Sequence, residues 1–156
     1  MGDHQMQRAD RLRTEGPRSV PWPVEGDTDV VAVDTTWGEL QPLDAAPGVR
    51  TVGELELVEL TEHGAVLVDS RTAGSFGGRT IPDSVLIPHD EVIQRRDELD
   101  PGRLSILFCN GPQCPQSPDA IRLLLEAGYP ATALAYYRGG MHDWVTLALP
   151  TQLRED

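Results

Sequence analysis

The two cysteines of the chain stand in one short segment, which reads Cys109-Asn110-Gly111-Pro112-Gln113-Cys114. This segment follows the apolar run 104–108 and precedes a predicted helix, so Cys109 is expected at the end of a buried strand and close to a helix N-terminus. Unpaired backbone amides and the helix dipole at such a position stabilise an anion and lower the pKa of a thiol. The predicted chemistry is nucleophilic attack by a Cys109 thiolate, held in a nest of loop amides that Gly111 and Pro112 shape.

The cysteines also allow two other interpretations. An unpaired cysteine is commonly just a small buried apolar residue, and the case for reactivity therefore depends on Cys114 in the same turn and on the position between strand and helix. A zinc site would need further ligands, but His63, His89 and His142 fall in unrelated segments. No metal is therefore expected.

Elements that would position the loop can be predicted from the apolar pattern. Strands are expected at 65–69, 85–87, 104–108 and 133–137. Helices are expected from a capping box at Thr51 to about Gly64, over 91–99, from an N-cap at Ser117 to a stop at Gly128, and after Gly139-Gly140.

Alternating strands and helices predict an α/β domain with a central, mostly parallel sheet and helices on both faces. Ligands of such sheets bind at the carboxyl ends of the strands. Asp69 and Cys109 each stand at the carboxyl end of a predicted strand, so both are expected at one edge of the sheet.

The predicted organisation has one domain at 51–151, preceded by a flexible tail at 1–28 and an extension at 29–50 that packs on the domain. Within the extension, Val30-Val31-Ala32-Val33 is expected as an edge strand, and Trp37, Leu40 and Pro42 as an apolar flap. Residues 152–156 are expected to be a short tail.

Composition excludes several partners. The net charge is −12 and all 13 basic residues are arginine, without a basic stripe, which argues against nucleic acid binding. No apolar run is long enough to cross a bilayer, and the N-terminus lacks the apolar core of a signal peptide. Two cysteines do not make a secreted disulfide framework, so a cytoplasmic protein that does not contact membranes is expected.

Three segments from about Thr51 to Pro150 resemble a rhodanese domain, and they occur in the order typical of that family. The first two read Val66-Leu67-Val68-Asp69-Ser70-Arg71 and Thr80-Ile81-Pro82-Asp83-Ser84-Val85-Leu86-Ile87-Pro88. The third is the closing motif Tyr137-Arg138-Gly139-Gly140-Met141-His142-Asp143-Trp144, followed by Leu149-Pro150.

This resemblance implies a sulfurtransferase that needs no cofactor. Cys109 would take sulfane sulfur from a small donor such as thiosulfate or a persulfide, and would pass it to a thiophilic acceptor such as a protein thiol. The residues implied to contact the substrate are Asn110, Gly111, Pro112, Gln113 and Ser117. Asp69 and Arg71 match a pair that supports the loop from beneath, and Cys114 is a resolving or assisting thiol.

The loop departs from the family pattern because it lacks the arginine or other cation that usually precedes the serine. Arg71, Arg79 or Arg138 are the candidates to supply that charge from neighbouring segments. Without the loop arginine, the phosphatase activity of the related cysteine phosphatases is not expected.

Two alternative functions stay open. In the first, Cys114 resolves a persulfide or sulfenic acid on Cys109 into a disulfide, which would make the pair a redox switch. In the second, the fold is a binding or regulatory module without catalysis. An exposed and acidic Cys109 thiol would favour the enzyme, and a buried and inert one the module.

Overall fold

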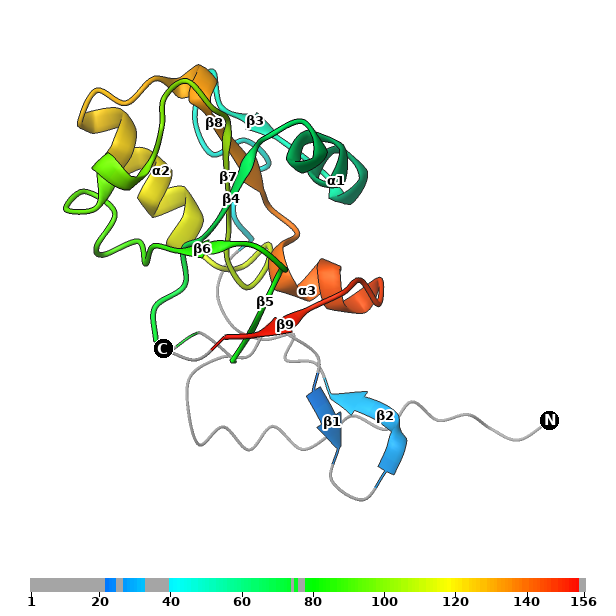
Figure 1. The fold of residues 1–156 in the computed structure, drawn as a ribbon. Helices are drawn as coiled ribbons and strands as arrows, with labels where there is room; N and C mark the ends of the chain where they lie inside the picture. Colours follow the sequence, from blue (N-terminus) through cyan, green and yellow to red (C-terminus); the bar gives the residue numbers. More distant parts are fainter. Residues whose placement is uncertain (1–21, 25–26, 33–39, 74, 76–77, 155–156) are drawn as a thin grey trace.

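A computed structural model describes residues 22–24, 27–32, 40–73, 75 and 78–154 of the chain. Its centre is a five-stranded, entirely parallel sheet with the strand order β3-β8-β7-β4-β6 (Figure 1). The strands are β3 (Arg50–Thr51), β4 (Val66–Asp69), β6 (Val85–Leu86), β7 (Ser105–Phe108) and β8 (Leu134–Tyr137). The predicted α/β class and the predicted strands of the sheet are confirmed.

Helices cover both faces of this sheet, which explains why its central strands are almost continuously apolar. Helix α2 (Gln116–Glu126) packs on one face, against a core that includes Val68, Leu107 and Tyr136. Helices α1 (Glu54–Glu62) and α3 (Gly140–Thr146) lie on the other side (Figure 1). The three central strands β4, β7 and β8 therefore carry two cores, one on each face.

Helix α1 begins later than the sequence predicts. Thr51 belongs to β3, where it pairs with Tyr136 of β8, and its hydroxyl donates to the Leu43 carbonyl. The residue that caps the helix is Gly53, whose amide donates to the Glu56 carboxylate at 3.3 Å. The prediction of Thr51 as the N-cap is wrong, because Thr51 belongs to the strand ladder with β8.

Helix α2 also begins at a different residue from the predicted one. It starts at Gln116 after Pro115, so Ser117 is already helical and its buried hydroxyl caps nothing. The other end agrees with the prediction, since Gly128 adopts a φ of 90° and its amide donates to the Leu125 carbonyl.

The segment 91–99 does not form the predicted helix. It contains turns and a 3₁₀ helix, η1 (Arg96–Glu98). Only Val92 and Leu99 of this segment are fully buried, so no continuous apolar stripe holds an α-helix against the core. A second 3₁₀ helix, η2 (Ala131–Ala133), leads into β8.

The chain on both sides of the predicted domain is more structured than expected. Strands β1 (Trp22–Val24) and β2 (Asp27–Ala32) form a separate antiparallel hairpin, so part of the predicted tail 1–28 lies in strands. The strand predicted at 30–33 is present over 30–32 as part of β2. Strand β9 (Gln152–Leu153) pairs with β5 (Arg79–Thr80), so the C-terminal tail assignment is also wrong there.

The apolar flap of the predicted extension is only partly tested. Trp37 lies outside the described residues, while Leu40 and Pro42 are exposed. Ala45 and Ala46 do pack against the core on the α2 side. In the described part of the chain, no helix has the length and apolarity needed to cross a membrane.

Candidate functional site

Cys109 leaves β7 at the carboxyl edge of the sheet, as the sequence predicts. The last residue of β7, Phe108, pairs with Asp69 of β4, and the Ser70 amide continues the ladder to the Phe108 carbonyl at 2.9 Å. The loop from Cys109 to Pro115 then leads directly into α2. Asp69 and the cysteine loop are therefore neighbours at one edge.

A close approach of the Gly139-Gly140 turn holds the first two carbonyls of the loop. The Met141 amide donates to the Cys109 carbonyl at 2.9 Å, and the His142 amide donates to the Asn110 carbonyl at 2.8 Å. Gly140 has a φ of 58°, and any Cβ there would overlap the Cys109 carbonyl oxygen. The turn therefore requires glycine at 140 for both backbone conformation and space.

The Cys109 sulfur takes its hydrogen bonds from different groups than the sequence suggests. The amide of Ser117, in the first turn of α2, donates to Cys109 Sγ at 3.4 Å. The thiol itself approaches the Cys114 carbonyl at 3.5 Å. Of the loop amides predicted to face the sulfur, that of Cys114 instead donates a hydrogen bond to the Gly111 carbonyl at 3.0 Å. The start of α2 thus supplies the amide donor to Cys109.

The two thiols have opposite electrostatics, which corrects the prediction that Cys109 is the acidic one. Burial raises the pKa of Cys109 well above its usual value, and the neighbouring Cys114 adds to this effect. A hydrogen bond from the Cys109 thiol lowers the pKa of Cys114 to about 7, helped by the backbone amides of Gln116 and Asn110 and the charge of Arg71. The thiolate of the pair therefore forms first on Cys114.

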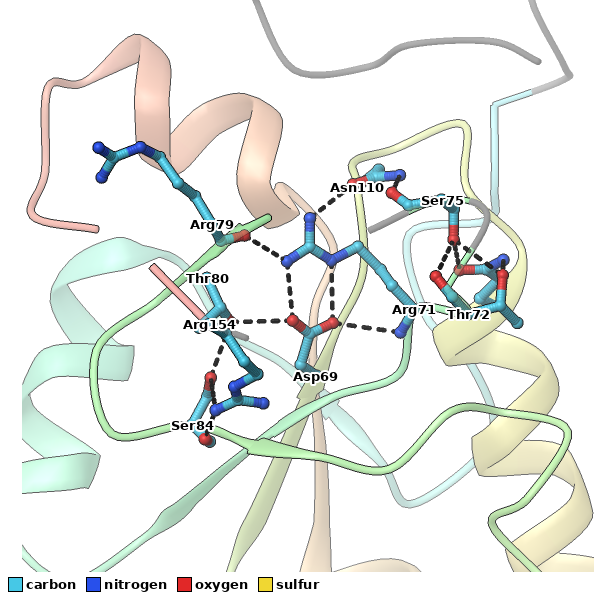
Figure 2. Close-up of polar contacts among 10 residues, drawn as sticks. Asp69, Arg71, Thr72, Ser75, Arg79, Thr80, Ser84, Asn110 and Arg154 are labelled. Carbon is cyan, nitrogen blue, oxygen red and sulfur yellow. Dashed lines mark hydrogen bonds and ion pairs between the residues drawn. The ribbon is translucent and has the colours of Figure 1, made fainter. Parts of the chain in front are cut away.

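A buried ion pair fixes the segment beside the loop (Figure 2). The Asp69 carboxylate accepts from Arg71 Nε at 2.9 Å and from Arg71 Nη2 at 2.7 Å, with both side chains almost fully buried. Thr80 adds a hydroxyl donor to the same carboxylate at 2.8 Å. This bidentate geometry with full hydrogen bonding is what makes a buried pair tolerable.

Asn110 connects this ion pair to the cysteine loop (Figure 2). Its side-chain oxygen accepts from Arg71 Nη1 at 3.1 Å, and its side-chain nitrogen donates to the Ser75 carbonyl at 2.8 Å. The Asn110 side chain thus makes hydrogen bonds within the protein, and its predicted substrate contact stays a prediction. Arg71 contacts the loop through Asn110, and the supporting role of Asp69 and Arg71 stays a prediction.

Hydroxyl and amide side chains tie the segment after β4 to the start of α2. Ser75 Oγ donates to the Gln116 side chain at 2.9 Å, and Gln116 donates in turn to Thr72 at 3.3 Å. The predicted substrate contacts at Gly111, Pro112 and Gln113 remain predictions, since no ligand is present. Gly111 is buried, while Pro112 and Gln113 are partly exposed.

The three arginines that could replace the missing loop cation are engaged elsewhere. Arg71 donates hydrogen bonds to Asp69 and Asn110, while Arg79 donates through Nη1 to the Thr151 hydroxyl at 3.0 Å. Arg138 donates through Nε and Nη2 to the Gln41 carbonyl at 3.1 and 2.9 Å. Arg71 nevertheless acts on the thiols through its charge, which lowers the pKa of Cys114.

Sequence reasoning missed Gln41, which lies against the cysteine loop. Its amide donates to the Pro112 carbonyl at 2.7 Å, and its carbonyl receives the Arg138 guanidinium. These are backbone contacts of a residue 71 positions before Pro112, so no side-chain pattern signals them. Ser75 and Thr80 were missed as site residues too, although Thr80 stands in a segment that carries the family motif.

The acidity of Cys114 leads to a pH prediction. The ultraviolet absorbance of the thiolate should rise with a midpoint near pH 7 in the wild type, because Cys114 loses its proton there. Cys109→Ala should move the midpoint upward, since it deletes the thiol that donates to Cys114. Cys114→Ser should remove the step near neutrality, and a step that survives in this variant would assign the low pKa to Cys109.

Within the described ranges, no three His, Cys, Asp or Glu side chains are grouped so that they could hold a metal ion. The site therefore consists of the two thiols, the backbone amides around them and the Asp69–Arg71–Asn110 network.

Comparisons with known proteins agree with this geometry. The rhodanese-like domain family matches residues 55–147. A curated relative, the HTH-type transcriptional regulator Rv0324 of Mycobacterium tuberculosis, is 34% identical over 96 residues. This match covers 61% of the chain and 41% of the regulator, so the chain spans less than half of that relative's length.

Solved structures show the same fold. The rhodanese-related protein of Thermoplasma volcanium has a TM-score of 0.57 and 20% identity, with 67% of this chain and 99% of that one covered. The thiosulfate sulfurtransferase of Pseudomonas aeruginosa has a TM-score of 0.57 and 24% identity, with 72% of this chain and 22% of that one covered. With the family match extending over more than half of its length, the chain belongs to the rhodanese-like domain family.

Proposed function

We propose that the protein is a sulfurtransferase in which Cys109 carries sulfane sulfur as a persulfide and Cys114 takes up the proton of Cys109. The observation that carries the proposal is the burial of the two thiols against each other, at a place where the Ser117 amide donates to Cys109 Sγ at 3.4 Å. The neighbouring Cys109 thiol lowers the pKa of Cys114 to about 7. A thiolate beside a thiol is a base in contact with a nucleophile, which is the arrangement that nucleophilic catalysis requires.

In the loading step, the Cys109 proton passes to the Cys114 thiolate, and Cys109 Sγ attacks the outer sulfur of the donor. A bond forms between Cys109 Sγ and that sulfur, and the sulfur–sulfur bond of the donor breaks. The leaving group departs with the electron pair, as sulfite from thiosulfate or as a thiolate from a persulfide. Transfer reverses this pattern when an acceptor thiolate attacks the outer sulfur and Cys109 leaves as a thiolate.

The donor that suits this site best is a persulfide. Thiosulfate carries two negative charges, and the arginines near the loop are engaged with Asp69, Asn110, Gln41 and Thr151. A persulfide anion carries a single negative charge. It therefore needs less positive charge from the protein and suits a loop that offers neutral hydrogen-bond donors. Physiological partners would then be small persulfides or the thiol of an acceptor protein in the cytoplasm.

A second candidate is a sulfur- or redox-responsive regulatory module, and the burial of both thiols favours it. Cys109 is 1% exposed and Cys114 4%, and the curated relative is a transcriptional regulator. In such a module, Cys114 would attack the inner sulfur of a Cys109 persulfide, form a disulfide and release hydrosulfide. A binding module without thiol chemistry would do neither.

Intact-mass spectrometry of the wild-type protein separates these functions. After incubation with glutathione persulfide or with thiosulfate, a sulfurtransferase should gain one sulfur, about 32 Da, located by peptide mapping on Cys109. Loss of two hydrogens without a gain of sulfur would identify the disulfide-forming switch instead. An unchanged mass with both donors would contradict the proposal and favour the binding module.

A further inference from the structure

Three buried hydroxyl groups lie around Cys109, and the Ser117 side chain already lowers the pKa of the Cys109 thiol. In the described part of the chain, five buried side-chain nitrogen or oxygen atoms lack a hydrogen-bond partner, and three of them are the hydroxyls of Ser70, Ser117 and Tyr136. All three residues are 0% exposed. A buried hydroxyl without a partner is destabilising, so hydroxyls of this kind beside one sulfur call for an explanation.

The sheet register places these groups around the cysteine. Val68 of β4 pairs with Leu107 of β7, which pairs with Tyr136 of β8, and all three side chains enter the core under α2. Ser70 stands two residues after Val68, and Cys109 stands two residues after Leu107. Because side chains alternate between the faces of a sheet, Ser70 and Cys109 lie on the same face as this row. Tyr136 therefore lies beneath Cys109 on the adjacent strand, and Ser70 lies beside it.

Two further observations relate Ser117 and Tyr136 to the cysteines. Ser117 stands above Cys109, because its amide donates to Cys109 Sγ at 3.4 Å. The pKa of Tyr136 is raised mainly by burial and additionally by the ionisable thiols of Cys109 and Cys114. The phenol thus lies within the electrostatic range of both sulfurs.

We propose that Ser70, Ser117 and Tyr136 form a hydroxyl cage that binds the outer sulfur of the Cys109 persulfide. This inference rests on the proposed function and goes beyond the family's loop by adding Tyr136 and Ser70 from the sheet. The outer sulfur of a persulfide carries a negative charge and accepts hydrogen bonds. Neutral hydroxyl donors directed at it would replace the cation that the loop lacks.

The test compares Tyr136→Phe with the matched control Tyr129→Phe. The Tyr129 hydroxyl is also buried, but Tyr129 follows α2, and its hydroxyl interacts with Ser105, which begins β7 at the end opposite Cys109. Each protein is equilibrated with known ratios of glutathione persulfide to glutathione, and the loaded fraction is read by intact mass. In the exchange, Cys109 gains the outer sulfur and glutathione takes up the proton that balances it.

Tyr136→Phe should lower the loading equilibrium constant by at least about tenfold, as expected for losing a hydrogen bond to a charged acceptor. Its melting temperature in the unloaded state should not fall, because the deleted hydroxyl has no partner there. Tyr129→Phe should leave loading unchanged. Ser70→Ala should weaken loading in the same direction and provides a second variant in case Tyr136→Phe does not fold.

The outcomes distinguish this inference from the proposed function. Absence of a mass gain in the wild type would contradict the sulfur carrier itself. Normal loading of the wild type, Tyr136→Phe and Ser70→Ala alike would overturn the cage and leave these hydroxyls as ligands of buried water. An equal fall of loading in Tyr129→Phe would also overturn it, because the effect would then be one of general stability.

Discussion

Replacing Cys109 by serine should abolish sulfur loading, with a fall of more than about a thousandfold in rate, because Cys109 is the proposed sulfur carrier and Cys114 acts as its base. A hydroxyl is close in size to a thiol, so the fold and the Ser117 amide contact at this position should survive. The measurement is the rate of the 32 Da mass gain with glutathione persulfide, together with thiocyanate release when cyanide is the acceptor.

Cys114→Ser is the matched control within the same loop. It removes the proton acceptor but leaves the nucleophile, so loading should slow by about a hundredfold and still reach one sulfur per chain. The rise of the loading rate through pH 7 should disappear together with the Cys114 thiolate. Equal and complete loss in both variants would instead mean that the two cysteines react as one unit, and loss confined to Cys114→Ser would exchange their roles.

Gly140→Ala should collapse the site without touching a sulfur atom. The new Cβ would overlap the Cys109 carbonyl oxygen and lie 2.8 Å from the Gly111 nitrogen. The φ of 58° adds strain for any residue with a Cβ. Together, overlap and strain should destabilise the fold by about 2 to 5 kcal/mol and displace the loop that carries Cys109.

Gly128→Ala separates strain from overlap. Gly128 has a φ of 90° at the end of α2, but a Cβ there would meet nothing within 4 Å. This variant should lose about 1 to 2 kcal/mol and keep normal loading. Chemical denaturation and the mass assay measure the two effects separately. If Gly140→Ala matched Gly128→Ala in both, the Gly139-Gly140 turn would not be what holds the loop.

The fold was largely predictable because its determinants are local. The runs that became β4, β7 and β8 are short, apolar and bounded by turn residues, and a strand buried on both faces has that pattern. The errors occurred where a tertiary contact overrides a local signal. Thr51 has the sequence pattern of an N-cap but pairs with β8. The segment 91–99 has the composition of a helix, but too few of its side chains are buried to hold an α-helix against the core.

The candidate site was predictable in position and not in electrostatics. Strand, loop and helix together place Cys109, but its burial to 1% and the direction of its pKa depend on how Cys114 folds back onto it. The roles of Tyr136 and Gln41 depend on strand register and on backbone contacts between distant segments. No local pattern encodes these, since a buried tyrosine in a strand normally means core packing alone.

The peptide of Gln41 joins the cysteine loop to the chain that precedes it. Its amide holds the Pro112 carbonyl, and its carbonyl is held by Arg138. By thermodynamic linkage, any chemical change at the cysteines that alters the position of Pro112 also alters the free energy of docking the Gln41 segment. The reverse holds with the same magnitude, so a force or ligand acting on that segment would tune the sulfur chemistry from outside the loop.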